Sequence, residues 1–188
     1  QAHQRDAGFR RRRLVSGEIA PERMAALPER LARAGASAEI MDRRALAALG
    51  ASADLALIDA PCSGSGAWAR RPDAKWRLTP ERLQALRAAQ GEALRLGAAS
   101  VRKGGALVYV TCSLFHSENH GAVAAFLAER PGFAPLALSP LWRRAGLAPE
   151  HAPPPRGGDP LEAASLQLSP ALHGTDGFHL CALRRVLD

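Results

Sequence analysis

Two thiols and one carboxylate stand where two apolar runs of the sequence end. The run at residues 53–58 leads into Asp59 and Cys62, and the run at residues 106–110 leads into Cys112. A cysteine thiolate is a strong nucleophile, and neighbouring positive charge lowers its pKa from an ordinary value of about 8.5. Such a thiolate can add to C6 of a pyrimidine ring, which makes C5 nucleophilic enough to take a methyl group. An acid assists by protonating or hydrogen-bonding the ring, and a second thiol can help to break the adduct.

Each of these residues also has a plainer interpretation. A lone cysteine is most often a small buried hydrophobic residue, and Cys181, inside an apolar run, keeps that interpretation. Asp59 could merely cap the turn that follows it. Disulfide oxidoreductases usually hold their cysteines in CxxC pairs, and the only imidazole close to Cys112 in the sequence, His116, is a weak candidate for a Cys–His hydrolase. Two thiols and a carboxylate at equivalent strand ends favour a chemical role.

The hydrophobic pattern predicts how these residues are positioned. Strands and helices alternate, which is typical of an α/β fold with a parallel sheet covered by helices. In open parallel sheets ligands bind at the carboxyl ends of the strands, and strands joined by a right-handed crossover usually lie side by side. Cys62 and Cys112 are therefore expected to face one crevice, with Asp59 at its edge. The predicted elements are a buried strand at 53–58, a helix from Thr79 to Gly104, a buried strand at 106–110, a helix at 120–128 and closing strands at 166–168 and 178–183.

The ends of the domain are predicted from composition. Residues 1–13 are polar and basic and form a tail, and residues 14–188 form a single, partial catalytic domain. A helix is predicted over residues 21–34, although Pro28 lies inside it, and a short strand over 38–41. The segment 149–160 is rich in proline and glycine and is predicted to be a loop.

Composition limits the class of protein. The chain has 188 residues, 47% of them hydrophobic, which suits one core. Its net charge is +7, and only Lys75 and Lys103 are lysines. The arginine excess has two explanations of equal weight, a polyanionic partner such as nucleic acid or the codon bias of a GC-rich genome.

Other classes are excluded at this level. No apolar run is long enough for a membrane span and no signal peptide opens the chain, so a cytoplasmic protein without membrane association is expected. Three cysteines without a CxxC pair indicate neither a disulfide framework nor a metal site. A monomer is expected.

Four motifs together resemble the RsmB/Sun (NOL/NOP/Sun) family of RNA cytosine-5 methyltransferases. The resemblance covers roughly residues 15–188, and the pair of cysteines is its most specific part. The motifs are D-A-P-C-S-G-S-G at 59–66, R-P-D-A-K-W at 71–76, V-T-C-S at 110–113 and H-G-T-D-G-F at 173–178.

The resemblance implies a role for each residue. Cys112 would attack C6 of a cytosine in RNA, Cys62 would assist release of the product, and Asp59 would contact the target cytosine. The implied fold is the Rossmann-like fold of class I methyltransferases, and the implied cofactor is S-adenosyl-L-methionine. Glu18 stands where the family has the acid that binds the cofactor ribose, and Asp42 where an acid near the adenine is expected. Asp59 completes the cofactor-binding candidates.

The implied partner is RNA, ribosomal RNA above all. Arg70, Arg71, Lys75 and Trp76 combine positive charge with an aromatic ring, which suits phosphate contacts and base stacking. Trp76 could equally be a core residue. Ala69 stands where the family usually has a further arginine.

The sequence departs from the family pattern in one respect. Upstream of Glu18 it contains no strand followed by a glycine-rich turn. The fold is therefore expected to lack its first, central strand and the glycine-rich cofactor loop. Two hypotheses follow: an RNA cytosine-5 methyltransferase, or a catalytically silent fragment that only binds RNA through its basic surface. Binding of the cofactor by this chain distinguishes them.

Overall fold

The computed structural model describes residues 13–17, 24–146 and 158–187. They fall into two compact units, which divide between Leu49 and Gly50. Each unit has its own sheet. The prediction of one catalytic domain over residues 14–188 stays a prediction. Residues 1–12 of the predicted tail and most of the predicted loop at 149–160 lie outside the described residues.

The first unit is built on two short parallel strands, β1 (Val15–Gly17) and β2 (Glu39–Met41), in which Gly17 pairs with Met41. It also contains α2 (Leu27–Arg33) and α3 (Arg43–Ala48). The helix predicted over 21–34 is confirmed from Leu27 to Arg33, where Pro28 lies in the first turn of α2, while its predicted start at residues 21–23 lies outside the described residues. Proline is tolerated in the first turn because its missing N–H would have no partner in the helix.

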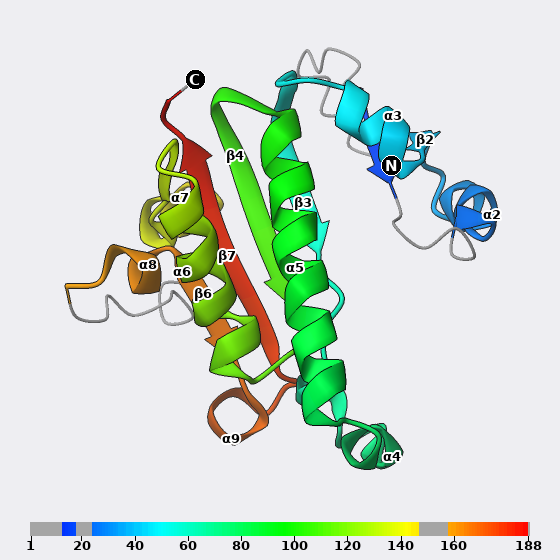
Figure 1. Ribbon diagram of the computed structural model, residues 1–188, viewed down its shortest axis with the longest axis vertical. Coiled ribbons are helices and arrows are strands. Elements are labelled where there is room, and N and C mark those ends of the chain that lie inside the picture. The colour runs from blue at the N-terminus through cyan, green and yellow to red at the C-terminus, as the bar shows by residue number, and fades with distance from the viewer. Residues whose placement is uncertain (1–12, 18–23, 147–157, 188) are drawn as a thin grey trace, which may run out of the picture. The chain divides into compact units, whose positions relative to one another are not determined.

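The second unit contains a five-stranded sheet in which β3, β4, β7 and β5 lie in that order and β6 also pairs with β7 (Figure 1). β3 and β4 are parallel, as predicted. β7 is antiparallel to β4, β5 and β6, so the predicted closing pair of strands is confirmed and forms the antiparallel part of a sheet whose β3 and β4 are parallel. The strands are β3 (Ala53–Asp59), β4 (Val101–Thr111), β5 (Phe133–Pro135), β6 (Ser165–Leu168) and β7 (Phe178–Arg185).

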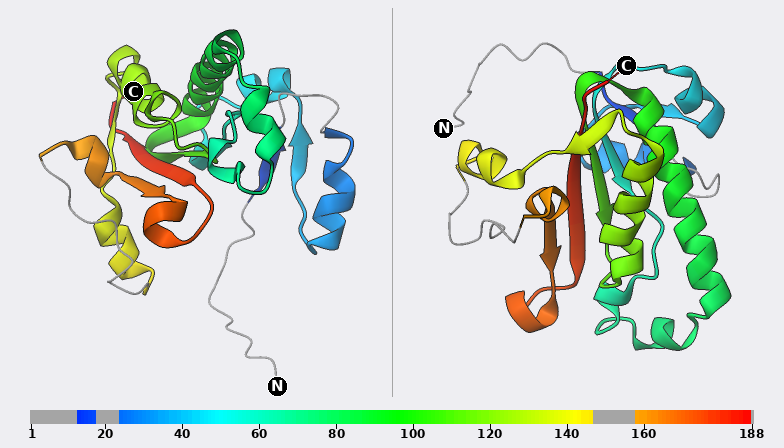
Figure 2. Two further views of the ribbon diagram at one scale, coloured as in Figure 1. Left: turned by 90° about the horizontal axis from the view of Figure 1, so that it is seen from below. Right: turned by 60° about the vertical axis from the view of Figure 1, so that its left-hand side comes forward.

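Two helices, α5 (Pro80–Ser100) and α6 (His120–Glu129), cover one face of this sheet (Figures 1 and 2). Thr79 caps α5 by accepting a hydrogen bond from the Arg82 amide. The helix ends before the predicted Gly104, which instead lies in β4 with φ +76°. The core beneath the helices includes Ile58, Leu94, Val101, Leu107, Tyr109, Val123, Phe126 and Leu183. The remaining helical segments are η1 (Ser65–Ala67), α4 (Pro72–Trp76), η2 (His116–Glu118), α7 (Leu138–Arg144), α8 (Pro160–Ala163) and α9 (Pro170–His173).

The continuous apolar run of β3 predicted a strand that is buried on both faces. The strand is confirmed, but only one of its faces is buried. Ile58 packs into the core, whereas Leu55 and Leu57, on the opposite face, are 58% and 67% exposed. Side chains alternate between the two faces of a strand, and only the Ile58 face meets α5. Within the part of the chain that the structure describes, β3 pairs with β4 alone.

Candidate active site

The two cysteine-bearing loops meet at the carboxyl ends of β3 and β4. The parallel register pairs Asp59 with Val110, and the Ala60 amide donates to the Val110 carbonyl at 2.9 Å. A loop follows each strand, and the Cys62 Sγ in one loop lies 3.4 Å from the Cys112 Sγ in the other. The prediction that the two strand ends bring the thiols together is confirmed by this contact. Asp59, the last residue of β3, is exposed beside them.

The contact between the sulfurs makes the two thiols unequal. Cys112 is exposed and Cys62 is half-buried, so the negative charge is better solvated on Cys112. A hydrogen bond from the Cys62 thiol lowers the pKa of Cys112 to about 6, against the opposing effects of burial and of the nearby Asp59 and Glu118 carboxylates. Donation of that hydrogen bond, together with burial, raises the pKa of Cys62. These two shifts favour the thiolate on Cys112 and the thiol on Cys62.

Glycines bring the loop after Cys62 against its neighbours. The Gly66 amide donates to the Cys112 carbonyl at 3.0 Å, and the Gly177 amide donates to the Gly66 carbonyl at 2.9 Å. A Cβ atom on Gly66 would lie 2.2 Å from the Gly177 carbonyl oxygen. Close backbone packing thus joins the motif at 59–66 to both the motif at 110–113 and the motif at 173–178.

The sequence analysis missed a buried carboxylate at the centre of this arrangement. Glu118, at the end of η2, is completely buried and accepts hydrogen bonds from Ser63, Ser113 and Gln90. In the sequence it stands among polar residues before a helix, a context typical of a solvated acid. No local pattern distinguishes it, because its burial results from contacts with residues 28 to 55 positions away.

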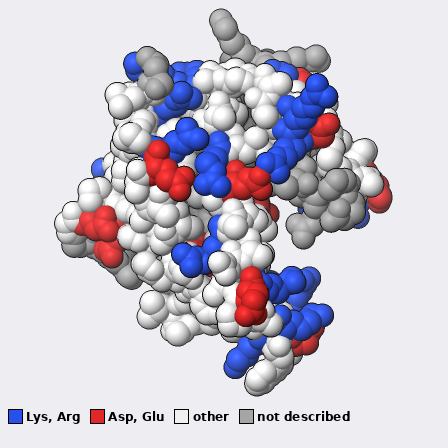
Figure 3. Space-filling model, in the orientation of Figure 1, with Lys and Arg blue, Asp and Glu red and all other residues white. Residues whose placement is uncertain are grey.

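The basic candidates lie on and next to α4, where Lys and Arg side chains gather on the surface (Figure 3). Trp76 is 82% exposed, which rules out the core interpretation, and the Lys75 Nζ lies 5.2 Å from the centroid of its ring. Arg71 is exposed, and Arg70 forms an ion pair with Asp176. An exposed aromatic ring beside several cations is an arrangement that can stack a base and contact phosphate.

The cofactor candidates are distributed over both units. Glu18 lies outside the described residues. Asp42 is exposed and is the N-cap of α3, where its Oδ1 accepts from the Ala45 amide at 2.8 Å. Only Asp59 lies in the same unit as the two thiols.

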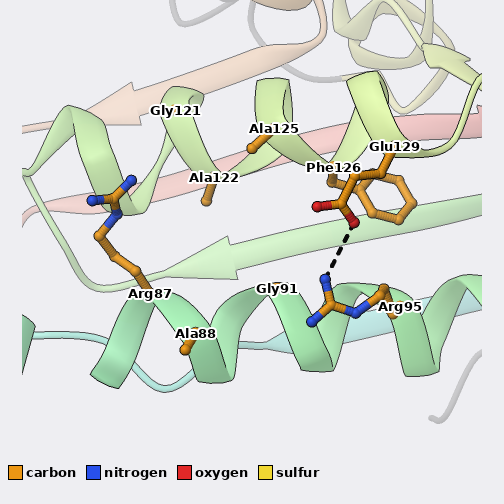
Figure 4. A pocket seen from close by; sticks show the side chains of 9 residues that line it. All are labelled: Arg87, Ala88, Gly91, Arg95, Gly121, Ala122, Ala125, Phe126 and Glu129. Atoms are coloured by element: carbon orange, nitrogen blue, oxygen red, sulfur yellow. Dashed lines mark hydrogen bonds and ion pairs between the residues drawn. The ribbon is translucent and has the colours of Figure 1, made fainter. Parts of the chain in front are cut away.

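A groove in the same unit is separate from the thiols. It lies between α5 and α6, is floored by small residues such as Ala88 and Gly121 and is bordered by Arg87 and by the Arg95–Glu129 ion pair (Figure 4). Neither cysteine lines it. Among the described residues, no cluster of acidic, histidine and cysteine side chains is suited to hold a metal ion. No helix in the described part is long and apolar enough to cross a bilayer.

The fold and the paired thiols define a Rossmann-like methyltransferase domain of class I. A solved structure titled "NSun6 from Pyrococcus horikoshii with SFG" matches with a TM-score of 0.71 and 28% identity, over 94% of this chain and 42% of that one. Residues 8–184 match the family described as "16S rRNA methyltransferase RsmB/F". The chain belongs to this family.

Named relatives agree with this assignment. The "Probable ribosomal RNA small subunit methyltransferase B" of Bacillus subtilis is 37% identical over 132 residues, which are 70% of this chain. The "Ribosomal RNA small subunit methyltransferase B" of Thermus thermophilus is 36% identical over 134 residues, 69% of this chain. The matched region spans 27% and 29% of these two relatives.

Proposed function

We propose that the protein methylates C5 of cytosine in RNA, specifically ribosomal RNA, with S-adenosyl-L-methionine as the methyl donor. The observation that carries this proposal is the pair of thiols at 3.4 Å, one of which is exposed with a lowered pKa. Membership of the RsmB/F family supports ribosomal RNA as the substrate, and the cytoplasm is the proposed location. The exposed Trp76 and the cations around it supply a surface for the RNA.

The covalent steps are proposed to use this chain's own residues. The Cys112 thiolate forms a bond to C6 of the target cytosine, and the electron pair of the C5–C6 double bond moves so that C5 becomes the nucleophile. The bound cofactor supplies an electrophilic methyl group to that carbon. Loss of the C5 proton to a base then restores the double bond, breaks the sulfur–C6 bond and returns the Cys112 thiolate. Cys62, the thiol next to the departing sulfur, assists this release, and Asp59 contacts the cytosine ring.

The acids that follow parallel strands fit the proposed cofactor. Gly17 and Met41 are paired residues at the ends of β1 and β2, and in the sequence Glu18 and Asp42 follow them directly. Carboxylates at the carboxyl ends of parallel strands accept hydrogen bonds from ribose hydroxyls and from an adenine amine. Glu18 and Asp42 of the first unit are therefore proposed as cofactor contacts, and Asp59 is proposed as a cofactor contact in the second unit.

Trapping with RNA that contains 5-fluorocytidine tests the nucleophile. Fluorine cannot leave C5 as the proton does, so the adduct persists and migrates as a protein–RNA complex under denaturing conditions. The wild-type chain should form this complex, Cys112→Ser should not, and Cys62→Ser should retain it. Cys181→Ala, a change at the buried thiol of β7, is the matched control. A complex that survives Cys112→Ser would refute the assignment.

Calorimetric titration of S-adenosyl-L-methionine tests the cofactor and the competing hypothesis of a silent RNA-binding fragment. The exposed Leu55 and Leu57 face of β3 is the observation that favours a fragment, because buried strands do not leave such a face to solvent. Micromolar binding supports the enzyme. Salt-sensitive RNA binding without cofactor binding supports the fragment.

A further inference from the structure

Glu118 contacts the loops on both sides of the thiol pair. Its Oε1 accepts from the Ser63 amide at 2.8 Å and from the Gln90 Nε2 at 3.0 Å. Its Oε2 accepts from the hydroxyls of Ser63 and Ser113. A fully buried carboxylate is costly unless hydrogen bonds replace its water, and here four donors do so.

The serines that bind Glu118 are the residues directly after the two cysteines. Ser63 follows Cys62 at the end of β3, and Ser113 follows Cys112 at the end of β4. A single carboxylate therefore joins two loops that are 50 residues apart in sequence. Because each serine is covalently next to its cysteine, a shift of either serine moves a sulfur.

Further bonds hold the opposite sides of the same cysteines. Gln90, on α5, also donates to the Pro61 carbonyl at 2.9 Å, so both neighbours of Cys62 are fixed. Asn119, next to Glu118, accepts from the Thr111 hydroxyl at 2.6 Å and donates to the Ser113 carbonyl at 2.8 Å. The loops are thus anchored to helices packed on the sheet and not only to each other.

We propose that Glu118 is a positioning residue, whose buried carboxylate sets the distance between the Cys62 and Cys112 sulfurs through Ser63 and Ser113. Its carboxylate is completely enclosed and both oxygens are occupied, so it acts on the thiols through the loops and does not touch a substrate. The importance of this role for catalysis rests on the proposed function, whereas the effect of Glu118 on the distance between the two sulfurs does not.

Oxidation by diamide measures that distance without RNA or cofactor. Diamide takes up two hydrogen atoms while Cys62 and Cys112 form a disulfide, and the bond requires the sulfurs to approach from 3.4 Å to about 2 Å. Loss of the two thiols is followed by mass spectrometry of the intact chain. Glu118→Gln should slow this cross-linking by about tenfold or more, as the loss of charge-assisted hydrogen bonds implies.

The pH dependence of Cys112 alkylation separates positioning from plain electrostatics. The Glu118 charge raises the pKa of Cys112, whereas the hydrogen bond from Cys62 lowers it and is the largest influence. Loss of the charge alone would move the pKa of Cys112 below about 6. Loss of the sulfur–sulfur contact would instead raise the pKa of Cys112. We expect an upward shift in Glu118→Gln, measured as the rate of iodoacetamide labelling against pH.

Glu129→Gln is the matched control, because it makes the same chemical change at an exposed carboxylate of α6. It should cross-link at the wild-type rate. If circular dichroism shows that Glu118→Gln does not fold, the double variant Ser63→Ala, Ser113→Ala replaces it in the test. This variant removes both hydrogen-bond donors to Oε2 of Glu118 and should also slow the cross-linking.

Wild-type cross-linking in a folded Glu118→Gln chain, or a lowered pKa of Cys112, would overturn the proposal. If the wild-type chain does not trap RNA while Glu118→Gln still slows cross-linking, the proposed function is refuted and the positioning role of Glu118 stands.

Discussion

Gly66→Ala tests whether the loop around Cys62 depends on close backbone contact. The added Cβ would lie 2.2 Å from the Gly177 carbonyl oxygen, whereas ordinary contacts begin at 3.4 Å, so the two loops must separate by roughly 1 Å. The contacting atoms are backbone and cannot rotate away. Separation also strains the hydrogen bonds from the Gly66 amide to Cys112 and from the Gly177 amide to Gly66.

The expected loss of stability follows from these two effects. Overpacking typically costs about 1–3 kcal/mol, and each weakened hydrogen bond adds about 1 kcal/mol. Gly66→Ala should therefore lower the free energy of unfolding by about 3–5 kcal/mol, a large share of the ~5–15 kcal/mol typical of a domain. The same displacement should slow diamide cross-linking of Cys62 and Cys112.

Urea unfolding followed by circular dichroism measures the change. Gly158→Ala is the control, because a Cβ atom there meets nothing within 4 Å and the residue is exposed, so its effect should stay within about 0.5 kcal/mol. A Gly66→Ala chain as stable as Gly158→Ala would show that the contact between the two glycine-containing loops is not required, and the reasoning would fail.

Three other measurements follow from single residues. His179 is buried, and burial lowers its pKa to about 4. Between pH 6.5 and pH 4 only the unfolded chain binds a proton at His179, so about 3 kcal/mol of stability is lost as the pH falls. His179→Phe should remove this dependence of the unfolding free energy on pH, and an equal dependence in both chains would contradict the account. Tyr109 donates to the buried Glu118 carbonyl at 2.7 Å, and Tyr109→Phe should cost about 1–3 kcal/mol in urea unfolding; an unchanged midpoint would mean that the carbonyl finds another donor. Trp76→Ala should weaken RNA binding in a filter assay by roughly 1–3 kcal/mol while leaving the unfolding midpoint unchanged, and an altered midpoint with unaltered RNA binding would return Trp76 to a structural role.

Local signals in the sequence were sufficient for most elements of the second unit. The apolar runs before Asp59 and Cys112 are the strands β3 and β4, and Thr79 begins α5. Because parallel neighbouring strands end at one edge of a sheet, the meeting of Cys62 and Cys112 could be predicted from these signals. Hydrophobic periodicity and capping depend on residues close in sequence, which is why they can be interpreted without a structure.

Other features depend on long-range contacts, and the sequence could not specify them. The apolar run of β3 gave no sign that Leu55 and Leu57 are exposed, since exposure depends on which elements pack against the strand. The pairing of β7 with β4 and β5, in addition to β6, depends on such contacts as well.

The sequence by itself determined that two thiols and an acid stand at strand ends, and its motifs identified the family. The tertiary structure decided how the thiols differ and what holds them. The lowered pKa of Cys112 requires the Cys62 sulfur beside it, and the burial of Glu118 requires donors from two loops and from α5. Hydrogen bonds act only over short distances in space, so their effects appear only once distant parts of the chain are brought together.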